Sequence, residues 1–239
     1  QGCANMINDC FIEAGLPSNI FNNLQIPSSL VSKVIEKDEI QGVAITGSIN
    51  AGKAVAKIAG ENLKKTVLEL GGNDPYLILE DAELDYAVKA CIEGRLLNNG
   101  QSCISAKRLI VTKNIIESFT KKLIDNLVSK VMGDPHDDVD YGPLVSLSAR
   151  AEVHKMVESS IKMGAKLNLG GKIPNIEGAY YPITVLSKVQ PGMPAFEEEI
   201  FGPVFSIIEA NNNNHAIDLA NNTKYGLGAA VFSSNISGG

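Results

Sequence analysis

Short apolar runs alternate with helical segments along the chain, and this alternation constrains the fold more than any other feature of the sequence. The strand-like runs are 41–46, 66–70, 76–79, 108–112, 165–169, 180–189, 204–210 and 227–233. The predicted amphipathic helices are 1–15, 28–37, 53–62, 80–98, 115–132, 147–163 and 215–222. Strands that alternate with helices of this length are typical of α/β proteins with largely parallel sheets. The sequence therefore predicts an α/β fold.

The composition excludes several functional classes. The 239 residues carry 21 Lys and Arg against 27 Asp and Glu, a net charge of −6, which argues against binding to a nucleic-acid backbone. No apolar run approaches the roughly 20 residues that span a bilayer, so no membrane association is expected. Four cysteines are too few for a disulfide scaffold, so a reducing compartment, the cytoplasm, is the expected location.

A glycine-bounded turn lies between the predicted strand 41–46 and the predicted helix 53–62. Backbone N–H groups at the start of a helix, with the helix dipole behind them, attract phosphate. The pattern Gly-x-x-x-x-Gly-Lys over 47–53 nearly matches a P-loop, with 76–81 as its acidic strand, but Ala54 lacks the hydroxyl that a P-loop offers to Mg²⁺. The other interpretations are a looser dinucleotide-phosphate turn and a turn that needs glycine only for steric reasons.

Two segments place carboxylates beside apolar residues. Glu69 stands between leucines at a strand end, where desolvation is expected to raise the pKa of its carboxyl and suit it to general-base chemistry. A salt-bridged glutamate at a turn is the plain alternative. The three acids 197–199 run into Phe201 and a Gly-Pro turn, so at least one of them is expected to point towards structured protein.

The cysteines divide into two kinds. Cys103 follows Gly-Gln-Ser in a polar segment after a predicted helix, where a thiol can be accessible and reactive. Cys91 lies on the apolar stripe of the helix 80–98 and is expected to be inert packing, as are Cys3 and Cys10 on the first helix. The three histidines have no Cys or His partner at ligand spacing, so no metal site is predicted.

Taken together, four motifs in this order resemble the aldehyde dehydrogenase superfamily over essentially the whole chain. They are Thr-Gly-Ser at 46–48, Leu-Glu-Leu-Gly-Gly at 68–72, Gly-Gln-x-Cys at 100–103 and Glu-Glu-Ile-Phe-Gly-Pro-Val at 198–204. Two segments are most similar to the succinate-semialdehyde dehydrogenase branch: Leu-Glu-Leu-Gly-Gly-Asn-Asp-Pro-Tyr at 68–76 and the later Ala106-Lys107-Arg108.

The resemblance implies oxidation of a small aldehyde, succinate semialdehyde in this branch, to the carboxylic acid with NAD or NADP as cofactor. Cys103 corresponds to the nucleophile, whose thiolate attacks the aldehyde carbonyl to give a thiohemiacetal. Hydride then leaves for the nicotinamide, and a thioester remains on the cysteine. Glu69 corresponds to the general base that activates water to hydrolyse this thioester.

The resemblance also implies which residues hold the cofactor. Gly47 and Ser48 correspond to the turn near the cofactor pyrophosphate, and Leu70 to a residue that touches the nicotinamide. Glu199 and Phe201 correspond to the positions that hold the nicotinamide ribose and ring.

The domain organisation of the family further implies two domains. Residues 1–70 would be the C-terminal part of a Rossmann-like NAD(P)-binding domain, and 71–239 a catalytic domain, incomplete at its C-terminus, with a largely parallel sheet flanked by helices. Family members run to about twice this length, so the chain is expected to be a fragment of a homo-oligomeric enzyme. It would lack an upstream asparagine of the oxyanion hole, and loss of one such donor typically costs ~10²–10³ in rate, so the fragment alone is expected to be inactive.

Two other functions remain open at the level of the sequence. One is a P-loop nucleotide hydrolase, whose binding of Mg²⁺-ATP would depend on Lys53. The other is a catalytically silent family member with a structural or binding role. Such a member would lack the cysteine or the glutamate, and both Cys103 and Glu69 are present.

Overall fold

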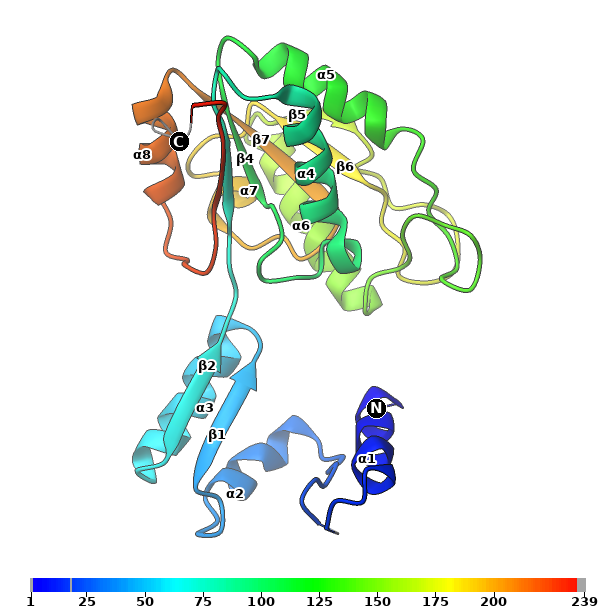
Figure 1. Cartoon of the computed structure of the whole chain (residues 1–239), viewed down its shortest axis with the longest axis vertical. Coiled ribbons are helices and arrows are strands. Elements are labelled where there is room, and N and C mark those ends of the chain that lie inside the picture. Colours follow the sequence, from blue (N-terminus) through cyan, green and yellow to red (C-terminus); the bar gives the residue numbers. More distant parts are fainter. Residues whose placement is uncertain (1, 18, 236–239) are drawn as a thin grey trace. The chain divides into compact units, whose positions relative to one another are not determined.

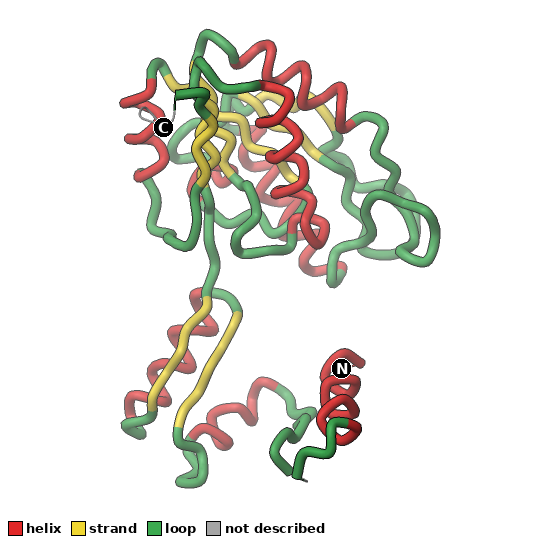
Figure 2. The backbone as a smooth tube through the Cα atoms, in the orientation of Figure 1, coloured by secondary structure: helices red, strands yellow, loops and turns green. Residues whose placement is uncertain are grey.

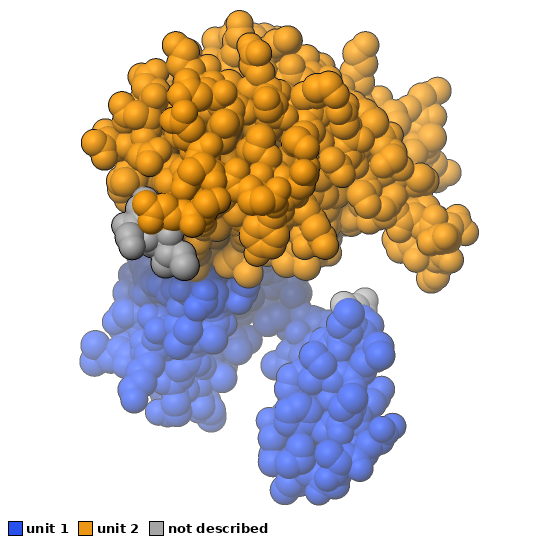
Figure 3. Space-filling view, turned by 45° about the horizontal axis from the view of Figure 1, so that its top comes forward, with its two compact units in different colours: residues 1–70 blue, residues 71–239 orange. Residues whose placement is uncertain are grey.

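The computed structural model describes residues 2–17 and 19–235, which form two compact units, 1–70 and 71–239 (Figure 3). Each unit is described by itself below. Their assignment to a cofactor-binding and a catalytic domain stays a prediction.

The first unit is built on a parallel pair of strands. Its elements are α1 (Gly2–Glu13), the 3₁₀ turn η1 (Ser28–Leu30), α2 (Val31–Ile35), β1 (Gly42–Thr46), α3 (Ile49–Glu61) and β2 (Lys65–Glu69) (Figure 1). The strands β1 and β2 pair in parallel, with Thr46 opposite Glu69 at their carboxyl ends. The helix α3 connects them, as the crossover between two parallel strands requires.

The first unit has a small core and a large exposed apolar surface. Ile35, Val55 and Ala59 are buried between α2, α3 and the strands, whereas no residue of α1 is buried. Cys3 and Cys10 are both exposed, so the prediction that they pack in a core is wrong. The predicted helix is present as α1, but none of its residues is buried, so its apolar stripe is not covered by the described residues.

The second unit is an α/β structure with helices packed around a sheet (Figure 2). The sheet has six strands in the order β5-β6-β7-β4-β3-β8. The strands are β3 (Pro75–Ile78), β4 (Arg108–Thr112), β5 (Lys166–Leu169), β6 (Thr184–Ser187), β7 (Val204–Ala210) and β8 (Ala230–Phe232). The helical elements are α4 (Leu84–Leu96), η2 (Leu97–Gly100), α5 (Ile116–Leu127), α6 (Leu147–Lys162), α7 (Pro194–Glu197) and α8 (Asn213–Asn221). Among the strands that the structure describes in this unit, only β5 and β6 pair in antiparallel fashion, which confirms the largely parallel sheet.

Helices cover both faces of this sheet. Leu109 and Val111 of β4 pack with α4 and α5 on one face, while Ile110 packs with α6, α7 and α8 on the other. All five residues of β4 are buried, as expected of a central strand in a parallel sheet covered on both sides. Burial of these apolar side chains stabilises the unit by about 1.5–3 kcal/mol for each large side chain.

Several element boundaries differ from the sequence prediction because local hydrogen bonds set them. The helix α3 begins at Ile49 rather than at 53, since the Ser48 hydroxyl caps it by accepting the Ala51 N–H. The helix α4 begins at Leu84 rather than at 80, since the Glu83 carboxylate caps its first turn. The strands β6 and β8 are shorter than the apolar runs that contain them, and the short helix α7 was not predicted.

Within the described residues, no helix combines the length and the apolar character that are needed to cross a bilayer.

Candidate active site

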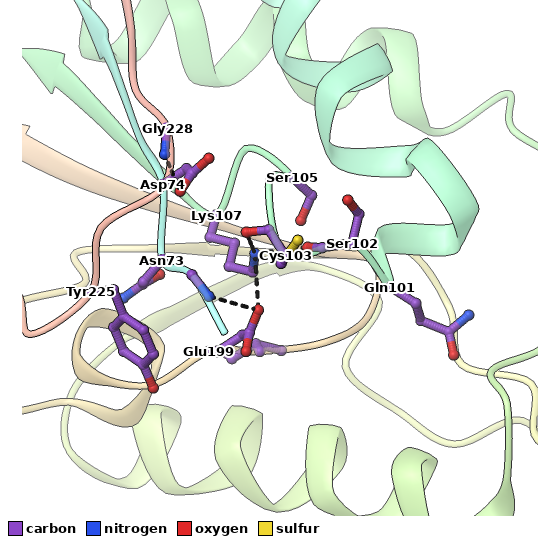
Figure 4. Close-up of polar contacts among 12 residues, drawn as sticks. Asn73, Asp74, Gln101, Ser102, Cys103, Ser105, Lys107, Glu199, Tyr225 and Gly228 are labelled. Atoms are coloured by element: carbon purple, nitrogen blue, oxygen red, sulfur yellow. Dashed lines mark hydrogen bonds and ion pairs between the residues drawn. The ribbon is translucent and has the colours of Figure 1, made fainter. Parts of the chain in front are cut away.

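Three loops meet at one edge of the six-stranded sheet (Figure 4). Asn73 and Asp74 precede β3, the segment from Cys103 to Lys107 precedes β4, and the segment from Glu199 precedes β7. Because β3, β4 and β7 are neighbouring parallel strands, their amino ends lie at the same edge. The topology therefore places two motifs that are almost 100 residues apart in the sequence side by side.

Glycines allow these loops to approach closely. A Cβ on Gly72 would lie 2.5 Å from the Cys103 carbonyl oxygen, and one on Gly71 would overlap a carboxylate oxygen of Glu199. Gly100 has a φ of +77°, and a Cβ there would overlap the backbone carbonyl of Gly202. The glycines of two motifs, at 71–72 and 100, are thus required where these segments pass the Cys103 and Glu199 segments.

Replacement of Gly100 by alanine is expected to destabilise the second unit by ~1–3 kcal/mol or more, because alanine disfavours this φ and its methyl group meets backbone. The midpoint of thermal unfolding measures the effect. The matched control is Gly226→Ala, where a Cβ would meet nothing within 4 Å. Equal midpoints for the two variants would show that the close approach at Gly100 is not required.

Cys103 is the half-buried cysteine at this edge. It follows η2, in which Asn98 and Asn99 adopt positive φ angles of 50° and 58°. The Gln101 carboxamide anchors the loop, since its Oε1 accepts the Val145 N–H at 2.8 Å. Cys91, in contrast, is fully buried in the core, and burial raises the pKa of its thiol, which confirms the prediction that it is inert packing.

Glu199 and Lys107 form an ion pair beside the Cys103 loop. Their side chains are 17% and 3% exposed, and Lys107 Nζ lies 3.3 Å from Glu199 Oε1. The same carboxylate oxygen accepts the Gly72 N–H at 3.1 Å. Lys107 also donates to the carbonyl oxygens of Ser102 and Cys103, both at 2.8 Å. One of the three consecutive acids therefore does point into structured protein, as the sequence predicts.

Two buried arginines hold the surrounding backbone. Arg95 of α4 donates to the Val204 and Ile200 carbonyls at 2.6 and 2.7 Å, and to the Ser105 hydroxyl at 2.6 Å. It thereby connects the loop that carries Cys103 to the segment around Phe201. Arg108 donates to the carbonyl of Asn73 and to the carbonyls of two residues at the end of α8.

Burial dominates the electrostatics of this edge. It lowers the pKa of Arg95 to about 9 and that of Arg108 to about 10, and it raises the pKa of Asp74. Asp74 accepts the Gly228 N–H at 3.1 Å, and its backbone carbonyl accepts the Lys107 and Arg108 N–H groups. A network of buried charges therefore surrounds the loop that carries Cys103.

In the first unit, the structure brings the phosphate-turn candidates next to Glu69. Gly47 and Ser48 are exposed between β1 and α3, and the Gly47 N–H donates to the Glu69 carbonyl at 2.9 Å. Glu69 itself is exposed, so the predicted desolvation of its carboxyl is not present; β2 is paired with β1 alone in this two-stranded sheet. Leu70 is half-buried against Gly52, where a Cβ would overlap its side chain.

The geometry of α3 excludes the P-loop interpretation. Gly52 lies inside the helix and is buried against Leu70, and Lys53 follows it within the same helix. A P-loop needs these residues in a loop whose N–H groups surround a phosphate. The glycine therefore serves helix packing rather than phosphate binding.

The predicted site residues thus fall into two groups. Cys103, Glu199 and Phe201 lie in the second unit. Phe201, two residues after Glu199, is 40% exposed. Gly47, Ser48, Glu69 and Leu70 lie in the first. Sequence reasoning missed Arg95, and it used Lys107 only as a family marker. The signal that could have found them is a cation at a position where the strand or helix periodicity requires burial.

The part of the chain that the structure describes contains no cluster of three or more His, Cys, Asp or Glu side chains suited to a metal ion.

Comparison with known proteins identifies the family. The model of the aldehyde dehydrogenase family matches residues 1–238. A succinate semialdehyde dehydrogenase of Escherichia coli (strain K12), named for NAD(P)+, is 43% identical over 98% of this chain and 51% of its own length. One of Mycobacterium leprae (strain TN), named for NADP(+), is 40% identical over 98% of this chain and 52% of its own length.

A solved structure agrees with these relatives. Succinic semialdehyde dehydrogenase from Streptococcus pyogenes, in complex with NADP+, superposes with a TM-score of 0.94 at 37% identity, over 98% of this chain and 52% of that one. The chain spans about half the length of the curated relatives it matches. Since the family model covers almost every residue, the chain belongs to the aldehyde dehydrogenase family.

Proposed function

We propose that the chain forms part of an enzyme that oxidises an aldehyde to its carboxylic acid with NAD or NADP, and that succinate semialdehyde is the substrate. The observation that carries the proposal is the meeting of the Cys103 loop, Glu199 and the Gly71-Gly72 pair at one sheet edge. The names of the relatives support the choice of substrate and cofactor.

The residues at both candidate cofactor positions fit a dinucleotide. Ser48 caps α3 directly after a parallel strand, so the first turn of that helix offers N–H groups and a dipole to phosphate. The Glu199 side chain stays partly exposed while Lys107 and the Gly72 N–H fix its carboxylate, which suits a group that accepts hydrogen bonds from ribose hydroxyls. The bound nicotinamide would supply the hydride acceptor.

In the proposed reaction, the Cys103 thiolate adds to the aldehyde carbon, and the carbonyl oxygen takes the electron pair. The Cys103 N–H donates to this oxyanion. The carbon must then lose hydride, for which a bound nicotinamide would be the acceptor, and water activated by Glu69 releases the acid from the thioester that remains. The Glu69 carboxyl is exposed in this chain, so the proposed role as base rests on the resemblance and not on desolvation. Cytoplasmic location and homo-oligomeric assembly stay predictions.

The test compares two proteins on a panel of aldehydes by the ultraviolet absorbance of the reduced nicotinamide. One is a protein of the relatives' length that contains these residues, and the other is the 239-residue chain. We expect the longer protein to prefer succinate semialdehyde to uncharged aldehydes of equal length, with both NAD+ and NADP+ tried. We expect the 239-residue chain to show no turnover. A preference for uncharged aldehydes would reject the substrate, and turnover by the chain alone would reject its predicted inactivity.

A further inference from the structure

Lys107 is a buried cation that fixes Glu199 but has no role at Cys103 in the reaction proposed above. Its ammonium group has three N–H donors and three acceptors within reach: the Ser102 carbonyl, the Cys103 carbonyl and Glu199 Oε1, at 2.8, 2.8 and 3.3 Å. Its side chain is only 3% exposed. An ammonium ion is costly to bury unless it is paired and hydrogen-bonded, so these contacts fix its position closely.

One of these contacts reaches the nucleophile through a peptide bond. The Ser102 carbonyl and the Cys103 N–H belong to the same planar peptide unit. A charged donor on the carbonyl oxygen shortens and strengthens the hydrogen bond there, and it polarises the N–H at the other end of the unit. The ammonium of Lys107 therefore acts on the group that would donate to an oxyanion at Cys103.

We propose that Lys107 is a positioning residue that orients and strengthens the Cys103 N–H as an oxyanion donor, through the Ser102–Cys103 peptide, while it holds Glu199 against the same loop. The proposal rests on the proposed function. When the Sγ–C bond forms and the carbonyl oxygen takes the electron pair, the N–H donates more strongly to that oxygen. Lys107 keeps its protons throughout the step.

The charges around Lys107 keep it in place. Burial lowers the pKa of its ammonium group, and Arg95 lowers it further, whereas Glu199 and Asp74 raise it. Glu199 comes from the segment before β7 and Asp74 from the segment before β3, so two neighbouring loops supply the balancing negative charge. The arrangement needs a cation at residue 107 with donors that reach two consecutive carbonyls.

The test is a nuclear magnetic resonance experiment on the 239-residue chain, which does not depend on activity. Selective ¹⁵N labelling of cysteine gives four amide resonances, for Cys3, Cys10, Cys91 and Cys103. Cys103→Ser assigns the one at the nucleophile, and the buried Cys91 reports whether the core is intact. In Lys107→Met we expect the Cys103 amide to move upfield, while Cys91 stays in place.

Lys113→Met is the matched control, because Lys113 is an exposed lysine directly after the same strand. It should leave all four resonances in place. A Cys103 resonance that is unchanged in Lys107→Met would overturn the proposal. If methionine at residue 107 prevents folding, Lys107→Arg decides: a resonance near its wild-type position supports the need for a cation, and an upfield shift despite the retained charge contradicts it.

The kinetic consequence is measured in the longer enzyme. Lys107→Met should lower kcat for aldehyde oxidation on the order of 10-fold, less than the ~10²–10³ that loss of a whole oxyanion donor costs. The KM for the aldehyde should change little, and Lys107→Arg should restore part of kcat. An unchanged kcat contradicts the proposal, whereas a wild-type enzyme that oxidises no aldehyde rejects the proposed function and leaves the resonance result standing.

Discussion

Replacement of Cys103 by serine should lower aldehyde oxidation by about 10⁴-fold or more, because no other group in the proposed site can form the thiohemiacetal. Sulfur is a far better nucleophile towards a carbonyl carbon than the oxygen of a serine hydroxyl that has no base beside it. The measurement is kcat/KM for the aldehyde in the protein of the relatives' length.

Cys10→Ser is the control for this variant. It makes the same substitution at an exposed cysteine on α1, outside the proposed site. It should retain wild-type activity. The unfolding midpoint of Cys103→Ser should also stay close to that of the wild type, since the residue is half-buried in a loop. Substantial activity in Cys103→Ser would show that another residue is the nucleophile.

Replacement of Arg95 by methionine should destabilise the second unit by ~3–5 kcal/mol, because three buried polar groups would each be left unsatisfied at a cost of about 1–3 kcal/mol. Two backbone carbonyls and the Ser105 hydroxyl would lose their donor inside the protein. For a unit of this size, the unfolding midpoint should fall on the order of 10 °C.

Two further variants isolate the cause of this loss. Arg150→Met removes a guanidinium that makes one hydrogen bond, to the Gly178 carbonyl, at the protein surface. It should cost no more than ~1 kcal/mol. Arg95→Lys keeps a cation of similar length but loses the planar guanidinium and its several N–H donors. Its unfolding midpoint should therefore lie between those of Arg95→Met and the wild type. A midpoint for Arg95→Met equal to that of Arg150→Met would contradict the structural role.

The fold was predictable from the sequence because its signals are local. Apolar runs such as 108–112 and 204–210 coincide with β4 and β7, since a strand buried on both faces reads as an unbroken apolar run. Element boundaries were less predictable. The side-chain caps at Ser48 and Glu83, which decide where α3 and α4 begin, depend on geometry that a periodicity does not contain.

The chemistry of the site was predictable only in part. Cys103 and Glu199 belong to recognisable motifs, but their meeting at the amino ends of β4 and β7 follows from strand order, which no local pattern specifies. Ligands of open parallel sheets usually bind at the carboxyl ends of the strands, so the general rule would have placed the site at the opposite edge.

The buried cations show a second limit of sequence reasoning. Lys107 and Arg95 have partners that are mostly backbone carbonyls, and a carbonyl is present at every residue. No residue type therefore marks the partner in the sequence. For Glu69 the sequence predicts burial that the structure does not have. Its sequence neighbours are leucines, but its strand β2 pairs on one side only in this chain, so the carboxyl is exposed.

The most direct test of the proposed chemistry is to trap the acyl enzyme. In the protein of the relatives' length, Glu69→Gln should still transfer hydride from succinate semialdehyde but should hydrolyse the thioester slowly. After one turnover, peptide mass spectrometry should find a succinyl group on Cys103 and no such group on Cys3, Cys10 or Cys91. A succinyl group on another residue, or hydride transfer with Cys103 unmodified, would contradict the assignment of Cys103 as the nucleophile.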